Sequence, residues 1–183
     1  HADWTDPDGE DTSAYEASKT LAARAAWDFV AEHPEMALTT VNPGMVYGPP
    51  MAEHYGSSLE LVAPFATGLL PASPRMNMPG VDVRDVARIH VRAIENDETV
   101  GRRPPANAGA LYLSEIAGAI GQALPDKRIS TSQLPIWLVK ALAPVVPVLR
   151  YAGKNLAYNG EVDGSDAPRM LGFEYIPTRD AVA

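Results

Sequence analysis

Tyr15 and Lys19 have the clearest chemical potential in this sequence, within the run Ser13-Ala14-Tyr15-Glu16-Ala17-Ser18-Lys19-Thr20. Residues four apart share one face of a helix, so the phenol and the ammonium are expected one turn from each other, about 5–6 Å apart. A positive charge at that distance favours the phenolate form of the tyrosine. The pair therefore indicates a general acid–base, with Tyr15 exchanging the proton and Lys19 assisting it.

An apolar segment and a Pro/Gly loop follow the helix that carries this pair. Residues 37–42 are nearly continuously apolar or β-branched, which predicts a buried parallel strand. The strand runs into the loop Asn42-Pro43-Gly44-Met45-Val46-Tyr47-Gly48-Pro49-Pro50. A strand that ends in a tight loop is typical of a ligand crevice at the carboxyl end of an open α/β sheet. An ordinary strand-to-helix turn remains the alternative.

Five stretches of the chain match the motifs of one enzyme family. They are Trp4-Thr5-Asp6, Tyr15 to Phe29, Asn42 to Pro49, Val81 to Ala87, and Leu171-Gly172-Phe173 with Tyr175 and Pro177. With these residues the chain resembles the extended short-chain dehydrogenase/reductases (NAD-dependent epimerase/dehydratase superfamily), in particular the dihydroflavonol reductase-like carbonyl reductases.

The resemblance implies an α/β fold: the C-terminal part of a Rossmann-type doubly wound parallel sheet plus a smaller, mainly helical substrate-binding lobe. Residues 1–48, with 81–98 packing back on them, would belong to the NAD(P)-binding domain, and residues 49–183 would form the lobe.

The resemblance also implies site residues. Tyr15 would deliver a proton to the substrate oxygen while reduced nicotinamide delivers hydride, and Lys19 would assist Tyr15 and hold the nicotinamide ribose. The loop Pro43, Gly44, Met45 and Val46 would contact the nicotinamide end of the cofactor. That cofactor is NADP or NAD, with NADP slightly favoured, and the substrate is a ketone or aldehyde, or the alcohol in the reverse direction.

Substrate specificity usually resides in the loop after the cofactor turn. Tyr47, His54 and Tyr55 are the candidate substrate-binding residues there, with a surface loop as the rival interpretation. A further set of methionines could line an adaptable apolar pocket or serve ordinary packing: Met45, Met51, Met76 and Met78.

Two features of the family pattern do not occur in this sequence. It contains no Gly-rich GxxGxxG or GxGxxG turn for a pyrophosphate, and no hydroxyl residue far enough upstream of Tyr15 to polarise a carbonyl. We therefore expect a C-terminal portion of a longer enzyme that is inactive on its own. Two alternatives remain open: a sugar-nucleotide epimerase or dehydratase, which uses the same Tyr and Lys, and a non-catalytic remnant lobe.

Composition excludes several other classes of function. A net charge of −8 argues against nucleic-acid binding, which needs a basic footprint. No apolar run reaches the roughly 18 residues of a membrane span. The absence of cysteine excludes disulfides and thiolate metal sites and fits a cytoplasmic protein. The four histidines have no ligand-like spacing, so no metal site is expected.

Several elements are predicted from periodicity and caps. A helix over about 13–32 should carry Ala14, Ala17, Leu21, Ala25 and Phe29 on one face. This face could pack on the sheet or against a second subunit in a homodimer. The other expected elements are helices over 58–70, 84–96, 114–125, 135–143 and 147–152, a strand over 81–83, and a short helix capped by Thr178. The cluster Asp82-x-Arg84-Asp85 is expected to cap a helix and form an ion pair.

Overall fold

The computed structural model describes residues 4–10, 12–50, 56–68, 70–145, 149 and 162–183 and has an α/β fold. The helices are α1 (Ala14–Glu32), α2 (Ser57–Ala66), α3 (Val83–Ile94), the 3-10 helix η1 (Asp97–Thr99), α4 (Leu113–Ala123), α5 (Ile136–Leu142), α7 (Asp166–Leu171) and α8 (Thr178–Val182). The strands are β1 (Asn42–Pro43), β2 (Met45–Tyr47), β3 (Asn77–Asp82), β4 (Pro105–Ala106) and β5 (Gly109–Tyr112).

The described strands form two small sheets that meet at the candidate cofactor loop. β1 pairs with β4 in parallel, while β2 pairs with β3 in parallel and β3 with β5 in antiparallel orientation. Gly44 separates β1 from β2, so the chain passes from one sheet to the other within the loop that the sequence marks as a ligand crevice.

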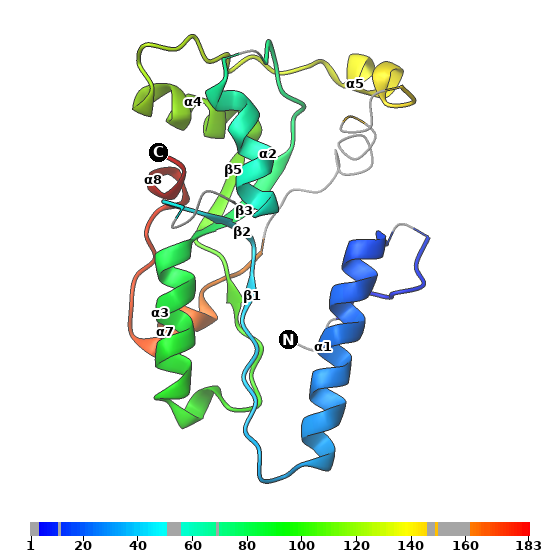
Figure 1. The fold of residues 1–183 in the computed structure, drawn as a ribbon, viewed down its shortest axis with the longest axis vertical. Helices are drawn as coiled ribbons and strands as arrows, with labels where there is room; N and C mark the ends of the chain where they lie inside the picture. The colour runs from blue at the N-terminus through cyan, green and yellow to red at the C-terminus, as the bar shows by residue number, and fades with distance from the viewer. Residues whose placement is uncertain (1–3, 11, 51–55, 69, 146–148, 150–161) are drawn as a thin grey trace.

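Helix α1 begins with a reciprocal cap and is set apart from the sheets. Ser13 and Glu16 form a capping box at its start, and the residue before Pro34 is its C-cap. Figure 1 shows α1 as a separate rod beside β1. The Trp4 ring contacts two guanidinium groups, that of Arg103 at 3.6 Å from the ring centroid and that of Arg24 of α1 at 5.5 Å. Trp4 therefore links α1 to the segment before β4.

The predicted helix 13–32 is confirmed, but its predicted apolar face is not buried. Leu21 and Phe29 are 55% and 52% exposed, whereas Thr20 on another side is buried. The helix is apolar on more than one face, and such a helix normally has more than one packing partner.

The predicted buried strand 37–42 is mostly wrong. Only Asn42 belongs to a regular strand, and the preceding residues are extended and partly exposed. Gly101 donates from its backbone N–H to the Leu38 carbonyl at 2.8 Å, and Thr40 donates to Arg102 at 3.2 Å. These bonds lie on one edge of the segment. Within the described residues no strand pairs with the other edge, so the segment lacks the neighbours on both sides that a buried strand of a parallel sheet has.

Other boundaries differ because of contacts that periodicity does not reveal. β3 begins at Asn77, earlier than the predicted strand 81–83, because it pairs with β5, which was not predicted. Val83 starts α3, and α2 ends at Ala66 rather than at 70. Pro177 takes the cap position before α8, while the Thr178 hydroxyl donates to the carbonyls of Gly80 and Gly109. Apart from residue 149, the predicted helix 147–152 lies outside the described residues.

In the part of the chain that the structure describes, the core consists of two clusters of buried side chains. One joins α2, α4, α5 and α8 over β3 and β5, and the other joins α3, α7 and β4 around Val81 and Ile89. The division into residues 1–48 with 81–98 and residues 49–183 stays a prediction.

Asp82 and Asp85 are fully buried carboxylates at the start of α3. Asp82 caps the helix at the Arg84 N–H and pairs with the Arg84 side chain, as the sequence predicts. Asp85 pairs with Arg88 and accepts a hydrogen bond from the Ile176 N–H at 2.7 Å. It thereby holds the segment before α8 against α3.

Candidate active site

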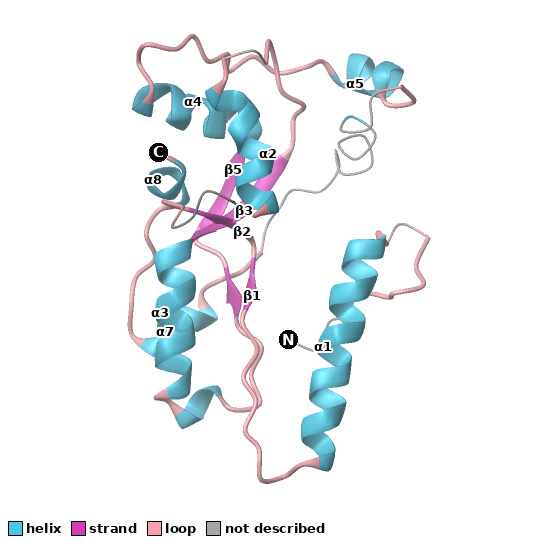
Figure 2. Cartoon of the chain, in the orientation of Figure 1, coloured by secondary structure: helices cyan, strands magenta, loops and turns pink. Residues whose placement is uncertain are grey.

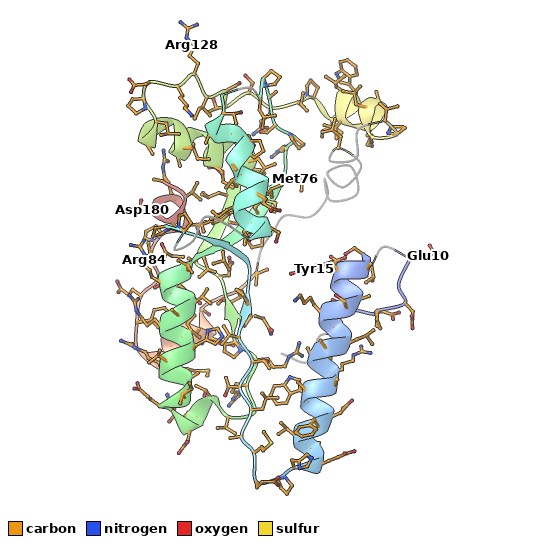
Figure 3. The ribbon with its side chains drawn as sticks, viewed as in Figure 1. Glu10, Tyr15, Met76, Arg84, Arg128 and Asp180 are labelled. Atoms are coloured by element: carbon orange, nitrogen blue, oxygen red, sulfur yellow. The ribbon has the colours of Figure 1, made fainter. Side chains whose placement is uncertain are left out.

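A pocket of about 530 Å³ lies between α1, the β1–β2 loop, α2 and β3. Tyr15 and Glu16 contribute from α1, residues 43–45 from the loop, residues 57–58 from the first turn of α2, and residues 76–79 from the start of β3 and the residue before it. In Figure 3 Tyr15 lies at the end of α1 nearer to Met76. The volume is in the usual range for small-molecule sites. The pocket brings together the predicted acid–base and most of the predicted cofactor loop.

Tyr15 and Lys19 are neighbours on α1, as their spacing requires. The Lys19 ammonium lies 5.5 Å from the centroid of the Tyr15 ring, within the range of a cation–π contact. Tyr15 is 68% exposed and lines the pocket, whereas Lys19 is not among the residues that form its wall. The phenol is therefore accessible to a ligand, and the ammonium stands beside its ring.

Glu16 is held in place by the capping box of α1. Its Oε2 accepts hydrogen bonds from the Ser13 N–H at 2.8 Å and from the Ser13 hydroxyl at 2.6 Å. These bonds from Ser13, the hydroxyl first and then the N–H, lower the pKa of the Glu16 carboxyl below its ordinary value. A fixed negative charge therefore stands next to Tyr15 in the pocket wall.

Gly44 is required by a close approach of two backbone segments. A Cβ at this position would lie 2.8 Å from the Pro79 carbonyl oxygen of β3. The close contact at Gly44 is therefore with the backbone of β3. The Gly44 N–H donates to the Ala106 carbonyl at 3.0 Å, so the loop is fixed against both sheets.

The same loop is also tied to α2. The Val46 N–H donates to the Ser58 hydroxyl oxygen at 3.2 Å, and that hydroxyl lies 4.0 Å from the sulfur of Met45. Val46 itself packs against the core and does not line the pocket.

Both alternatives for the methionines hold in part: Met45, Met76 and Met78 line the pocket, while Met76 and Met78 are also buried in the core and Met45 packs against it. Met51 lies outside the described residues. Sequence reasoning missed the contributions of Glu16, residues 57–58 and Asn77. The S-x-x-E pattern of the capping box could have drawn attention to Glu16. No local signal places α2 or the start of β3 opposite Tyr15.

Of the three candidate substrate residues, the structure describes only Tyr47, and Tyr47 does not come together with Tyr15. Tyr47 is 1% exposed and belongs to the core below α2, and burial raises the pKa of its phenol. It does not line the pocket that contains Tyr15. His54 and Tyr55 lie outside the described residues, so their proposed roles stay predictions.

Two negative observations apply to the part of the chain that the structure describes. It contains no group of three or more acidic or histidine side chains arranged to hold a metal ion. None of its helices combines the length and apolar character needed to cross a bilayer.

Comparison with known protein families identifies the family of this chain. The model of the NAD dependent epimerase/dehydratase family matches residues 2–109. The chain belongs to this family. The extended short-chain dehydrogenase/reductase resemblance of the sequence motifs is thereby confirmed.

Individual relatives of this family member are reductases. The chain is 27% identical to the NADPH-dependent methylglyoxal reductase of Saccharomyces cerevisiae, over 99% of its own length and 52% of that protein. It is 30% identical to a cinnamoyl-CoA reductase of Medicago truncatula, over 89% of its own length and 44% of that protein.

The fold of this family member matches solved structures as well. The yeast methylglyoxal/isovaleraldehyde reductase complexed with NADPH superimposes with a TM-score of 0.71 at 26% identity, covering 92% of this chain and 48% of that chain. The chain therefore has the fold of part of a Rossmann-type reductase, and it spans about half the length of the curated relatives it matches.

Proposed function

We propose that the whole protein containing this chain is an NADPH- or NADH-dependent oxidoreductase, with NADPH preferred, that reduces a ketone or aldehyde to an alcohol. The observation that supports this most strongly is the single pocket that combines Tyr15, the loop 43–45 and the methionine-rich wall. The relatives named above as an NADPH-dependent reductase and an NADPH complex support the choice of cofactor.

In the proposed reaction, the hydroxyl of Tyr15 donates its proton to the carbonyl oxygen of the substrate. Lys19 stabilises the phenolate left behind, since its ammonium lies beside the same ring. The methionines surround the rest of the substrate with adaptable apolar surface. NADPH supplies the hydride when it is bound.

The residues present fit the nicotinamide end of a dinucleotide. The loop 43–45 borders the pocket next to Tyr15, and its backbone is fixed by the Gly44 and Val46 hydrogen bonds. Lys19, the cation of α1 beside the Tyr15 ring, is the candidate partner of the ribose. No Gly-rich turn for the pyrophosphate occurs in the sequence, so the rest of the cofactor needs residues beyond this chain.

A sugar-nucleotide epimerase is the rival function within the same family. The described pocket wall contains no lysine or arginine, and a diphosphate sugar is normally held by such side chains. This observation favours the reductase.

Steady-state assays separate the proposals. We expect the whole protein to oxidise NADPH in the presence of small aldehydes and ketones, and to leave UDP- and dTDP-sugars unchanged. Residues 1–183 alone should show no turnover. Sugar epimerisation without carbonyl reduction would overturn the proposal, and micromolar NADPH binding by the isolated chain would contradict its expected inactivity.

A further inference from the structure

Within the described part of the pocket wall, Glu16 is the one residue with a charged side chain. The other lining residues are tyrosine, proline, glycine, methionine, serine and asparagine. We propose that Glu16 determines substrate specificity: its carboxylate makes the pocket reject anionic carbonyl compounds and accept uncharged ones. This proposal rests on the proposed reductase function and specifies its substrate class.

The position of the Glu16 carboxylate is fixed. The Ser13 N–H and hydroxyl both donate to its Oε2, and the Glu16 N–H returns a bond to the Ser13 hydroxyl oxygen. Because this box caps the start of α1, turning the carboxylate away would lose both hydrogen bonds from Ser13, and the cap therefore favours the observed position. The same bonds lower the pKa of the Glu16 carboxyl, so it stays ionised at neutral pH.

No residue of the described pocket wall carries a positive charge that would offset the Glu16 carboxylate at a bound ligand. The Lys19 ammonium is engaged over the Tyr15 ring and does not line the pocket. The facing wall consists of Met76, Asn77 and Met78, which offer thioethers and one amide. An anionic group bound beside Tyr15 would therefore contact one negative side chain and no positive one in this wall. The Lys19 charge beyond the Tyr15 ring acts on it equally with and without the Glu16 carboxylate, so the effect of Glu16 is obtained by comparing the two.

The size of the effect follows from the exposure of the site. Glu16 is largely exposed, so water and salt screen its charge, and repulsion at about 6 Å weakens anion binding roughly three- to tenfold. The favoured substrates are small neutral aldehydes and ketones with apolar substituents. Keto acids, sugar phosphates and coenzyme A thioesters are disfavoured, which would separate this protein from relatives such as the cinnamoyl-CoA reductase.

The test compares pyruvate with its neutral counterpart methyl pyruvate in the whole protein. In Glu16→Gln, the ratio of kcat/KM for pyruvate to that for methyl pyruvate should rise roughly three- to tenfold. Glutamine at this position can keep the capping box, and circular dichroism checks that the fold is retained. The matched control is Glu32→Gln, the same charge change at the far end of α1, which should leave the ratio unchanged.

Salt gives a second readout that a purely structural role would not affect. Raising the ionic strength should increase the pyruvate to methyl pyruvate ratio in the wild type and not in Glu16→Gln. If the wild type reduces methyl pyruvate but the ratio does not change in Glu16→Gln, or changes equally in Glu32→Gln, the specificity proposal is wrong. If no neutral carbonyl is reduced at all, the proposed function itself is wrong.

Discussion

At the scale of single residues, contacts between residues two to four positions apart hold polar and charged side chains in place. Lys19 stands beside Tyr15, the Ser13 cap holds Glu16, and Arg84 holds Asp82. The first two pairs lie at the pocket, and the third fixes the start of α3 next to β3. Each pair therefore holds a polar or charged side chain in place at the start of a helix: Tyr15 and Glu16 on α1, and Asp82 before α3.

The Asp82–Arg84 pair predicts a pH dependence of stability. Arg84, chiefly through its side-chain hydrogen bonds, holds the pKa of Asp82 below its ordinary value. A lowered folded pKa means that the stabilisation is complete above the unfolded pKa of about 4 and is lost as the pH falls through the folded pKa. Because Arg84 is half-exposed, the pair contributes only about 0.5–1 kcal/mol.

Asp82→Asn should keep a capping side chain but lose the charge pair. We expect its free energy of unfolding to lie about 0.5–1 kcal/mol below that of the wild type at pH 7, and the difference to shrink below about pH 4. Urea unfolding at a series of pH values measures this, with Asp97→Asn as the control. A difference that is constant down to the acid transition would show that the ion pair is not its origin.

At the scale of elements, the position of the candidate site is set by the junction between the two small sheets. The β1–β2 loop is held by β4, β3 and α2 at once, through Gly44 and Val46. The pocket lies between this junction and the N-terminal end of α1. Its shape is therefore sensitive to any displacement of the loop.

Gly44→Ala should disturb both stability and the pocket. The new methyl group would lie 2.8 Å from the Pro79 carbonyl oxygen, a backbone atom that cannot rotate away. We expect a loss of about 1–3 kcal/mol in unfolding free energy, together with a raised KM for NADPH in the whole protein. Gly56→Ala is the control, because a Cβ there meets no atom within 4 Å. Equal behaviour of the two variants would contradict this role of Gly44.

The elements that were predictable from the sequence are those with local signals. The caps Ser13 and Asp82 mark the starts of α1 and α3, and Gly172, in the left-handed conformation, closes α7. The short strands β4 and β5 and the early start of β3 depend on pairing between distant segments. For the same reason the motifs at Tyr15 and residues 43–46 could be found from the sequence, whereas the contributions of residues 57–58 and Asn77 could not.

At the scale of the whole molecule, α1 packs little against the other described elements. It stands apart from the sheets in Figure 2, and it exposes Leu21 and Phe29. Large exposed apolar residues that lie together on one helix are typical of interaction surfaces. The homodimer through helix 13–32 that the sequence suggests therefore stays a prediction worth testing.

We expect the whole protein to be a dimer in solution and the double variant Leu21→Glu/Phe29→Glu to be monomeric, because two new charges would be desolvated at the interface. Sedimentation equilibrium measures the mass of each. Ile94→Glu, at an 86% exposed position on α3, is a control for added surface charge and should remain dimeric. A monomeric wild type, or a dimer that survives both α1 substitutions, would rule out this interface.

The most direct measurement of the central claim is the kcat for carbonyl reduction by Tyr15→Phe in the whole protein. Because the proton that Tyr15 donates is lost with its hydroxyl, we expect kcat to fall at least about 100-fold while NADPH still binds. Tyr112→Phe, which removes a hydroxyl outside the pocket wall, should keep the wild-type kcat. A Tyr15→Phe protein that reduces carbonyls at nearly the wild-type rate would contradict the assignment of Tyr15 as the acid.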